Sequence, residues 1–172
     1  MSDLRSAPVR ALSADDHVRG PAGAPLLIEY ADLECAYCAA LHVRLEELRA
    51  RVPVRIAYRH FPVRSSHPRA WAAACATEAA AVQGRFWEMH DAILADQGHI
   101  EDPHLWQLAE RLGLDLERFE TDRRSDSVRE RVRSDFTGGV RAGVVTTPTI
   151  FRDGSAFSGA SLRSTLAALL PI

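Results

Sequence analysis

The sequence predicts an α/β fold in which a long helical segment is inserted between two β-containing parts. Three observations lead to this prediction. Residues 25–61 read as strand, helix and strand, residues 68–140 carry helical patterns in several pieces, and residues 144–170 read as two short strands and a last helix. With 172 residues, 47% of them hydrophobic, the chain has enough apolar material for one well-buried core and is too short for two typical domains.

The charge pattern argues against two classes of partner. The chain has 21 basic and 23 acidic residues and no long run of one sign, so nothing marks it for nucleic acid or an anionic membrane. Its first twenty residues lack the apolar core of a secretory signal, and no stretch approaches the roughly 18 apolar residues of a membrane-spanning helix. We therefore expect a cytoplasmic protein that acts on small molecules or proteins.

The first strand and helix are predicted from a change of periodicity at residue 35. Residues 25–34 form a compact apolar run that suits a strand covered on both faces, and Glu29 is its exception. The following apolar positions recur at steps of three and four, as in an amphipathic helix: Cys38, Leu41, Leu45, Leu48 and Val52. Cys35 then lies at the first helical turn and Cys38 at the head of the buried stripe, so we expect one exposed and one covered thiol.

The second strand follows Pro53, which ends the helix. Apolar residues alternate with Arg55 and Arg59 between residues 54 and 59, a pattern typical of a strand with one apolar face. Strand, helix and strand form a βαβ unit, and this unit places both cysteines at the strand-to-helix turn.

The insertion predicts helices over residues 68–83, 85–97, 102–113 and 115–140. Five glycines are expected to separate these pieces: Gly84, Gly98, Gly113, Gly138 and Gly139. Arginines and acids alternate in the segment 127–136, which predicts a solvated helix face. After the insertion, two β-prone runs flank Asp153 and Gly154, a favourable hairpin turn, and Ser161 is the expected N-cap of the closing helix.

The two closely spaced cysteines fit either zinc binding or redox chemistry. Structural zinc needs four ligands. The only other cysteine is Cys75, the nearest downstream histidine, His42, could add a third ligand, and no fourth is evident. A helix N-terminus instead provides free N–H groups and partial positive charge, which stabilise a thiolate on Cys35. We therefore expect redox chemistry, without a metal or another cofactor. Cys75 shares a helical face with Trp71 and should be a buried, inert thiol.

Several motifs occur in the order found in one known family. They are DDHVRGPAGAPLLIEYADLECAYCAALH (15–42), YRHFP (58–62), AAAVQGRFWEMHDAIL (79–94), LAERLGLD (108–115) and GVVTTPTIF (143–151). Together they resemble the DsbA-like thioredoxin-fold thiol-disulfide oxidoreductases, from about residue 10 to the end. The resemblance implies a thioredoxin-like fold with an inserted helical domain. It divides the chain into a flexible N-terminus (1–9), an N-terminal part with the cysteines (10–62), the helical insertion (63–140) and a C-terminal part (141–172).

The resemblance also assigns roles to the residues of the cysteine motif. It makes Cys35 the nucleophile, Cys38 the resolving thiol, and Glu29 a buried acid that exchanges a proton with Cys38. Ala36 and Tyr37, between the cysteines, are expected to contact substrate. The residues alone leave another reading of Glu29 open, that of an edge-strand glutamate facing water.

The proline loop completes the expected site. A proline between β-prone residues belongs at an edge or a bend, and X-Pro is the one common route to a cis bond. The resemblance implies that Pro148 is a cis-proline facing the disulfide and that Thr147 offers its backbone to a substrate. An ordinary trans turn is the alternative.

The expected function is thiol-disulfide exchange through the Cys35/Cys38 pair. Its partners would be disulfide- or thiol-containing proteins, together with a small-thiol or thioredoxin-type electron partner. The alternative is a non-catalytic thioredoxin-fold module that binds a peptide or partner at the Pro148 loop. Because Tyr37 brings no positive charge to Cys35, we expect a reduction potential between those of thioredoxin and DsbA, and a resting protein that is largely reduced in the cytosol.

Overall fold

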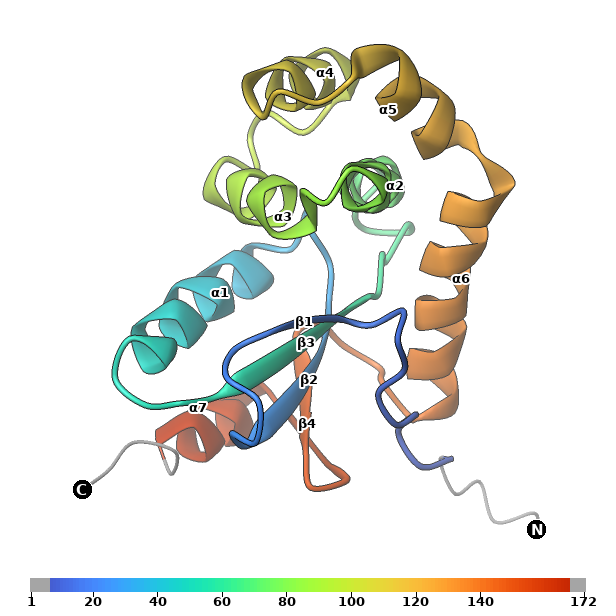
Figure 1. The fold of residues 1–172 in the computed structure, drawn as a ribbon. Helices are drawn as coiled ribbons and strands as arrows, with labels where there is room; N and C mark the ends of the chain where they lie inside the picture. Colours follow the sequence, from blue (N-terminus) through green and yellow to red (C-terminus); the bar gives the residue numbers. More distant parts are fainter. Residues whose placement is uncertain (1–6, 168–172) are drawn as a thin grey trace, which may run out of the picture.

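A five-stranded sheet forms the centre of the molecule in the computed structural model, which describes residues 7–167 (Figure 1). The strands are β1 (His17–Arg19), β2 (Leu26–Ala31), β3 (Arg55–His60), β4 (Thr149–Arg152) and β5 (Ser155–Ser158). The helices are α1 (Ala36–Arg49), α2 (Ala70–Val82), α3 (Phe86–Ala95), α4 (Asp102–Arg111), α5 (Leu116–Arg124), α6 (Asp126–Arg141) and α7 (Gly159–Ala167). The predicted α/β class is confirmed.

Strand β2 is the central strand of the sheet, whose order is β1-β3-β2-β4-β5. It pairs with β3 in parallel through the predicted βαβ unit, and with β4 antiparallel. Strands β4 and β5 form the predicted hairpin, in which Asp153 (φ 49°) and Gly154 (φ 79°) make the turn. The short β1, which pairs antiparallel with β3, was not predicted from the sequence.

Helices cover both faces of the sheet, because successive residues of β2 point to opposite sides. Leu27 packs with the apolar stripe of α1 and with Leu162 of α7, whereas Ile28 and Tyr30 pack on the other face, near α6. Helices α2 to α5 lie above one end of the sheet in Figure 1. Their apolar side chains form one cluster with Cys35 and Cys38, so the cysteine turn lies between the sheet and this helical layer.

Strand β3 differs from its predicted one-sided pattern, because the N-terminal segment covers its second face. The guanidinium of Arg59 is fully buried and donates to both carboxylate oxygens of Asp16, at 2.8 and 3.0 Å. It also donates to the carbonyls of Arg10 and Ala11. A buried charge needs such partners, and they lie more than forty positions away in the chain, so local alternation could not reveal them.

Helix α6 corrects one further expectation and adds a buried acid. Gly138 and Gly139 lie inside the helix instead of ending it, because Gly139 lets the backbone approach the sheet: a Cβ there would lie 2.7 Å from the Phe61 ring and 2.9 Å from that of Tyr30. The expected solvated face is present, because residues 127, 129, 130, 133 and 134 are exposed, while the opposite side of the helix is buried. Asp135 is buried, accepts the backbone N–H of His60 at 3.1 Å, and pairs with Arg131.

Two segment boundaries also differ from those predicted. A break at Ser125, whose side chain caps Val128 N, divides the expected helix 115–140 in two. Helix α7 begins at Gly159, and Ser161 lies inside its first turn with its hydroxyl on the backbone of Ser158. The end of the predicted closing helix, residues 168–170, falls outside the described residues. At the other terminus, the N–H of Ala7 donates to the Arg141 carbonyl at 2.8 Å.

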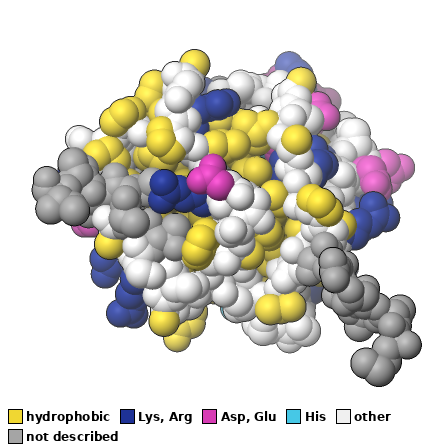
Figure 2. Space-filling model, turned by 90° about the horizontal axis from the view of Figure 1, so that it is seen from below, with side chains coloured by type: hydrophobic (Ala, Val, Ile, Leu, Met, Phe, Trp, Pro, Cys, Tyr) yellow, Lys and Arg dark blue, Asp and Glu magenta, His cyan; other side chains and the backbone are white. Residues whose placement is uncertain are grey.

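The surface below the sheet has a mixed character. Figure 2 shows this face from below, with hydrophobic side chains visible in its middle and both basic and acidic side chains among and around them. Within residues 7–167, no helix is long and apolar enough to cross a membrane.

Candidate active site

The cysteine motif begins where β2 passes into α1. Cys35 is the N-cap residue of α1, and its N–H donates to the Asp32 carbonyl at 3.1 Å. The N–H of Cys38 donates back to the Cys35 carbonyl at 3.0 Å, which closes the first turn of the helix. The backbone N–H groups of Tyr37 and Cys38 also interact with the Cys35 sulfur, as expected for a helix N-terminus.

The proline loop before β4 lies directly against Cys35. The Thr147–Pro148 peptide bond is cis, and the Cys35 sulfur is 3.7 Å from the Thr147 carbonyl oxygen. The structure thus brings together the two parts of the expected site, which are 112 positions apart in the chain.

The exposure of the motif differs from expectation. Cys35 retains only 4% of its surface and Cys38 retains none, so both thiols are buried rather than one exposed and one covered. Thr147 and the helical layer, which contributes Gln97, cover the Cys35 side of the turn. Ala36 and Tyr37 are the exposed residues of the motif, and Tyr37 has 78% of its surface free.

The pKa values of the two thiols are shifted in opposite directions. A hydrogen bond from the Cys38 thiol lowers the pKa of Cys35 to about 5 against the opposing effect of burial, and Thr147 and the N–H groups of Tyr37 and Cys38 add to this lowering. Burial, together with the hydrogen bond and charge of Cys35, raises the pKa of Cys38 well above its ordinary value. At neutral pH, Cys35 is a thiolate and Cys38 is a thiol.

Glu29 lies in the interior of the sheet and not at an edge. It is opposite Tyr58 of β3 on one side and Ile150 of β4 on the other, and it retains 4% of its surface. Burial raises its pKa to about 7, although the charge of Arg19 opposes this shift. Its charge also contributes to the raised pKa of Cys38, so the two groups are electrostatically coupled.

Asp32 organises the turn and is a site residue that the sequence did not single out. Its buried carboxylate accepts the N–H groups of Glu34 at 2.8 Å and Val63 at 2.7 Å, and its Oδ2 pairs with His67 at 2.9 Å. Its own N–H donates to the Cys38 sulfur at 3.4 Å. A signal was present, because an aspartate at the end of a buried strand often accepts nearby backbone N–H groups.

The neighbouring acid, Glu34, points away from the sulfur. Its carboxylate accepts the backbone N–H of Arg69 at 2.7 Å and the Nε of the same residue at 2.8 Å. The Glu34 charge is therefore paired with Arg69 at the start of α2, which limits its repulsion of a Cys35 thiolate.

Gln97 ties the helical layer to the turn. Its amide nitrogen donates to the carbonyls of Leu33 at 2.9 Å and Cys35 at 3.0 Å. No local pattern marks this glutamine, because it follows α3 and lies 62 positions from Cys35 in the chain.

His42, the third ligand of the alternative zinc site, groups with other residues and not with the two cysteines. Among the described residues, the group able to hold a metal is His42, His90 and Asp91, which includes neither cysteine. Arg19 already donates two hydrogen bonds to Asp91, at 3.0 and 2.9 Å, and lies 3.3 Å from a ring nitrogen of His42. The Arg19 guanidinium therefore already pairs with the Asp91 carboxylate that a metal ion would need as a ligand.

Cys75 is buried apart from the motif. It packs with Trp71, Val128 and Val132, and burial raises its pKa to about 11. Such a thiol stays protonated and is a poor nucleophile at neutral pH.

Comparison with known proteins identifies the family of this chain and several relatives. The family model described as thioredoxin matches residues 12–171. The Na(+)/H(+) antiporter NhaA 3 of Salinispora tropica is 44% identical over 149 residues, and the match covers 84% of this chain and 22% of that protein. The chain spans between 22% and 25% of the length of this and similar curated relatives, which carry the same antiporter name.

Solved structures show the same fold. A thioredoxin-like oxidoreductase from Silicibacter pomeroyi has a TM-score of 0.78 and 24% identity, with 91% of this chain and 92% of that chain covered. The thiol-disulfide exchange protein alpha-DsbA2 from Wolbachia pipientis has a TM-score of 0.78 and 19% identity, with 91% and 88% covered. The resemblance found in the sequence is confirmed: the chain belongs to the thioredoxin family and has the fold of its DsbA-like members.

Proposed function

We propose that this protein is a thiol-disulfide oxidoreductase whose reacting groups are Cys35 and Cys38. The observation that carries the proposal is the opposite acidity of the two thiols at one helix N-terminus, with the Thr147 carbonyl 3.7 Å from the Cys35 sulfur. A thiolate is the attacking species in disulfide exchange, and a thiol held protonated beside it can complete the reaction in a second step.

The first step forms a mixed disulfide. The Cys35 thiolate attacks one sulfur of a substrate disulfide, the substrate S–S bond breaks, and the other substrate sulfur leaves as a thiolate that takes a proton from water. In the second step Cys38 loses its proton and attacks the Cys35 sulfur, which breaks the mixed disulfide and releases the second substrate thiolate, again protonated by water. The substrate gains two electrons, and Cys35 and Cys38 end as a disulfide. Run in reverse, the same steps oxidise a dithiol.

Glu29 is the proposed proton acceptor for Cys38. It is buried, it is coupled to Cys38, and its pKa of about 7 lets it take or release a proton near neutral pH. Arg19 opposes the shift and so keeps part of the Glu29 population ionised at this pH.

The proposed substrate contacts are the exposed Ala36 and Tyr37 and the half-buried Thr147 around the sulfur. Ala36 and Tyr37 lie at the surface of the turn, and Thr147 lies at the start of the hairpin with its carbonyl toward Cys35. A thiol-bearing protein segment lying along Thr147 would present its sulfur to Cys35. A small-thiol or thioredoxin-type partner would then return the cysteines to the dithiol state.

Catalytic reduction of a protein disulfide tests the proposal. Reduction of insulin by dithiothreitol, followed by turbidity, should be accelerated by the wild-type protein and by Cys75→Ser, and not by Cys35→Ser. Cys38→Ser should accumulate a mixed disulfide through Cys35, visible by mass spectrometry as the mass of one substrate chain. A protein that folds, binds peptides and never accelerates the reaction would instead be the non-catalytic binding module.

A further inference from the structure

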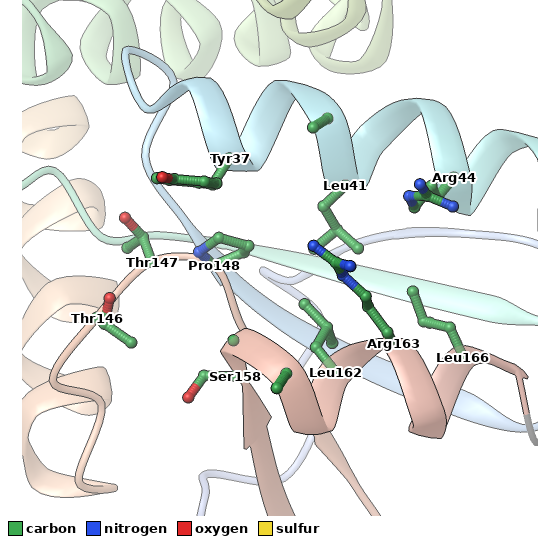
Figure 3. A pocket seen from close by; sticks show the side chains of 13 residues that line it. Tyr37, Leu41, Arg44, Thr146, Thr147, Pro148, Ser158, Leu162, Arg163 and Leu166 are labelled. Carbon is green, nitrogen blue, oxygen red and sulfur yellow. The ribbon is translucent and has the colours of Figure 1, made fainter.

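A groove leads away from the cysteine motif between α1 and α7. It has a volume of about 760 Å³ and begins at Tyr37, Thr147 and Pro148. From there it follows the facing sides of the two helices, over the buried side chains of Leu41 and Leu162 (Figure 3). A second hollow shares Arg44, Arg163 and Leu166 with it and continues to Arg51, so the groove extends beyond the two helix midpoints.

Two arginines face each other across this groove. Arg44 projects from α1, and Arg163 reaches from α7 toward α1, above Leu162 (Figure 3). Within residues 7–167, neither guanidinium makes a hydrogen bond, an ion pair or a ring contact. The remaining charged groups along the groove are Arg51 and one acid, Glu47, so its lining has a net positive charge. Unpaired guanidiniums over an apolar floor favour a carboxylate carried by an otherwise apolar segment.

The spacing from the sulfur determines the size of the ligand. Arg44 follows Cys35 by nine positions along the helix, which corresponds to about 13 Å at ~1.5 Å per residue. An extended chain covers that distance in about four residues, at ~3.3 Å each. Glutathione carries its carboxylates within one residue of its cysteine, closer to the sulfur than this spacing, whereas a polypeptide spans the distance in about four residues.

We propose that Arg44 and Arg163 select polypeptide substrates that carry an acidic side chain about four residues from the reacting cysteine. The substrate lies in the groove with its sulfur at Cys35 and its carboxylate between the two guanidiniums. This inference rests on the proposed oxidoreductase function and adds a substrate class to it. Charge complementarity of this kind acts mainly on the rate of productive encounter, so it should appear in the second-order rate and weaken with salt.

Peptides of matched sequence test the proposal. Each is a ten-residue peptide whose single cysteine is a mixed disulfide with a chromogenic thiophenol, with Glu or Gln four residues before or after the cysteine. At low ionic strength, Glu at one of these positions should raise the rate of attack by Cys35 about threefold to tenfold over Gln, the range for one or two exposed ion pairs. The Arg44→Gln/Arg163→Gln double variant should lose this preference, and Arg118→Gln, an exposed position on α5, should retain it.

Oxidised glutathione provides the second control. Its rate should fall far less than the peptide rate in the double variant, because its carboxylates lie closer to its sulfur than the four-residue spacing that matches the pair. Equal rates with Glu and Gln peptides in the wild-type protein, or a preference that survives in the double variant, would overturn the selectivity and leave the oxidoreductase function standing. A glutathione rate that falls as much as the peptide rate would also overturn it, because the arginines would then act on the thiolate itself. Failure of every disulfide to react would refute the proposed function instead.

Discussion

Cys35 and Cys38 carry the same functional group, and their surroundings make Cys35 a stronger acid and Cys38 a weaker acid than an ordinary thiol. The largest contribution to the low pKa of Cys35 is the hydrogen bond from the Cys38 thiol. The proposed resolving thiol, Cys38, therefore also lowers the pKa of the proposed nucleophile, and it can donate this hydrogen bond only while it is protonated.

This dependence makes the first prediction. Thiolate absorbance at 240 nm, followed against pH on the reduced protein, should show Cys35 titrating near pH 5. In Cys38→Ala the donor is gone, so the midpoint should rise by at least a unit toward the ~8.5 of a free thiol. Cys75→Ala should leave the midpoint where it is. An unchanged midpoint in Cys38→Ala would mean that the helix terminus alone sets the acidity.

Glu29 makes the second prediction, which concerns stability. Its pKa rises from 4.5 to about 7 on folding, so between these values the folded protein holds a proton that the unfolded chain has lost. Stability contributed by the protonated acid is complete below pH 4.5 and is lost as the pH rises through 7. By pH 8 the loss should be on the order of 3 kcal/mol, at about 1.4 kcal/mol for each unit of pKa shift.

Glu29→Gln should remove this loss. The free energy of unfolding, measured by urea denaturation of the reduced proteins, should favour the variant increasingly between pH 5 and pH 8. The comparison is made at equal pH, so that titration of the cysteines affects both proteins alike. A difference that stays constant with pH would show that the glutamate does not titrate on folding, and the proton-acceptor role would then lack its basis.

At the scale of elements, the contact between α6 and the sheet depends on one glycine. A Cβ on Gly139 would lie under 3.0 Å from both Phe61 and Tyr30, whereas one on Gly138 would meet only the Tyr30 hydroxyl, at 3.6 Å. Both glycines lie in the same turn of the same helix. They therefore share the same cost in helix propensity and differ only in what an added side chain would contact.

The third prediction compares alanine at these two positions. Gly138→Ala should raise the free energy of unfolding by up to about 1 kcal/mol, because alanine is the better helix former. Gly139→Ala should lower it by about 1–3 kcal/mol, since the two buried rings must move apart or the helix must shift. Chemical denaturation measures both. Equal effects would mean that α6 adjusts freely over the sheet.

These elements also show what the sequence could and could not predict. The βαβ unit, the hairpin at Asp153 and Gly154, and the position of Cys35 at a helix start rest on local patterns, and the structure contains them. Arg59 was misread, because its partners Asp16 and Arg10 come from a segment outside its strand. Gly139 was misread for a similar reason: a glycine that ends a helix and one that admits a neighbouring ring look alike in sequence.

The candidate site follows the same division. Cys35, Cys38 and Glu29 belong to one continuous segment and were singled out there, while the role of Asp32 in the turn was not. Gln97 and His67 reach the turn from the helical layer and from the loop after β3, so only the fold brings them to it. Long-range contacts of this kind leave no periodicity in the sequence.

At the scale of the whole molecule, the acidity of Cys35 sets the tendency of the protein to accept electrons. Its pKa of about 5 lies between the ~7 of thioredoxin and the ~3.5 of DsbA. The fourth prediction is therefore a reduction potential between about −270 and −120 mV, measured by equilibration with glutathione and alkylation of the free thiols. A potential below that of thioredoxin would mean that the thiolate gains no stabilisation in the folded protein.

The separation of the two thiol pKa values also determines how many protons travel with the electrons. Above pH 5, reduction of the disulfide yields one thiolate and one thiol, so two electrons bring one proton; below pH 5 they bring two. Each proton changes the equilibrium tenfold per pH unit, which for two electrons is about 30 mV. The potential should therefore fall by about 30 mV per pH unit near neutrality and by about 59 mV per unit in acid. The protein then keeps its power to accept electrons over a wider range of pH than a pair of ordinary thiols, whose exchange would carry both protons up to their much higher pKa values.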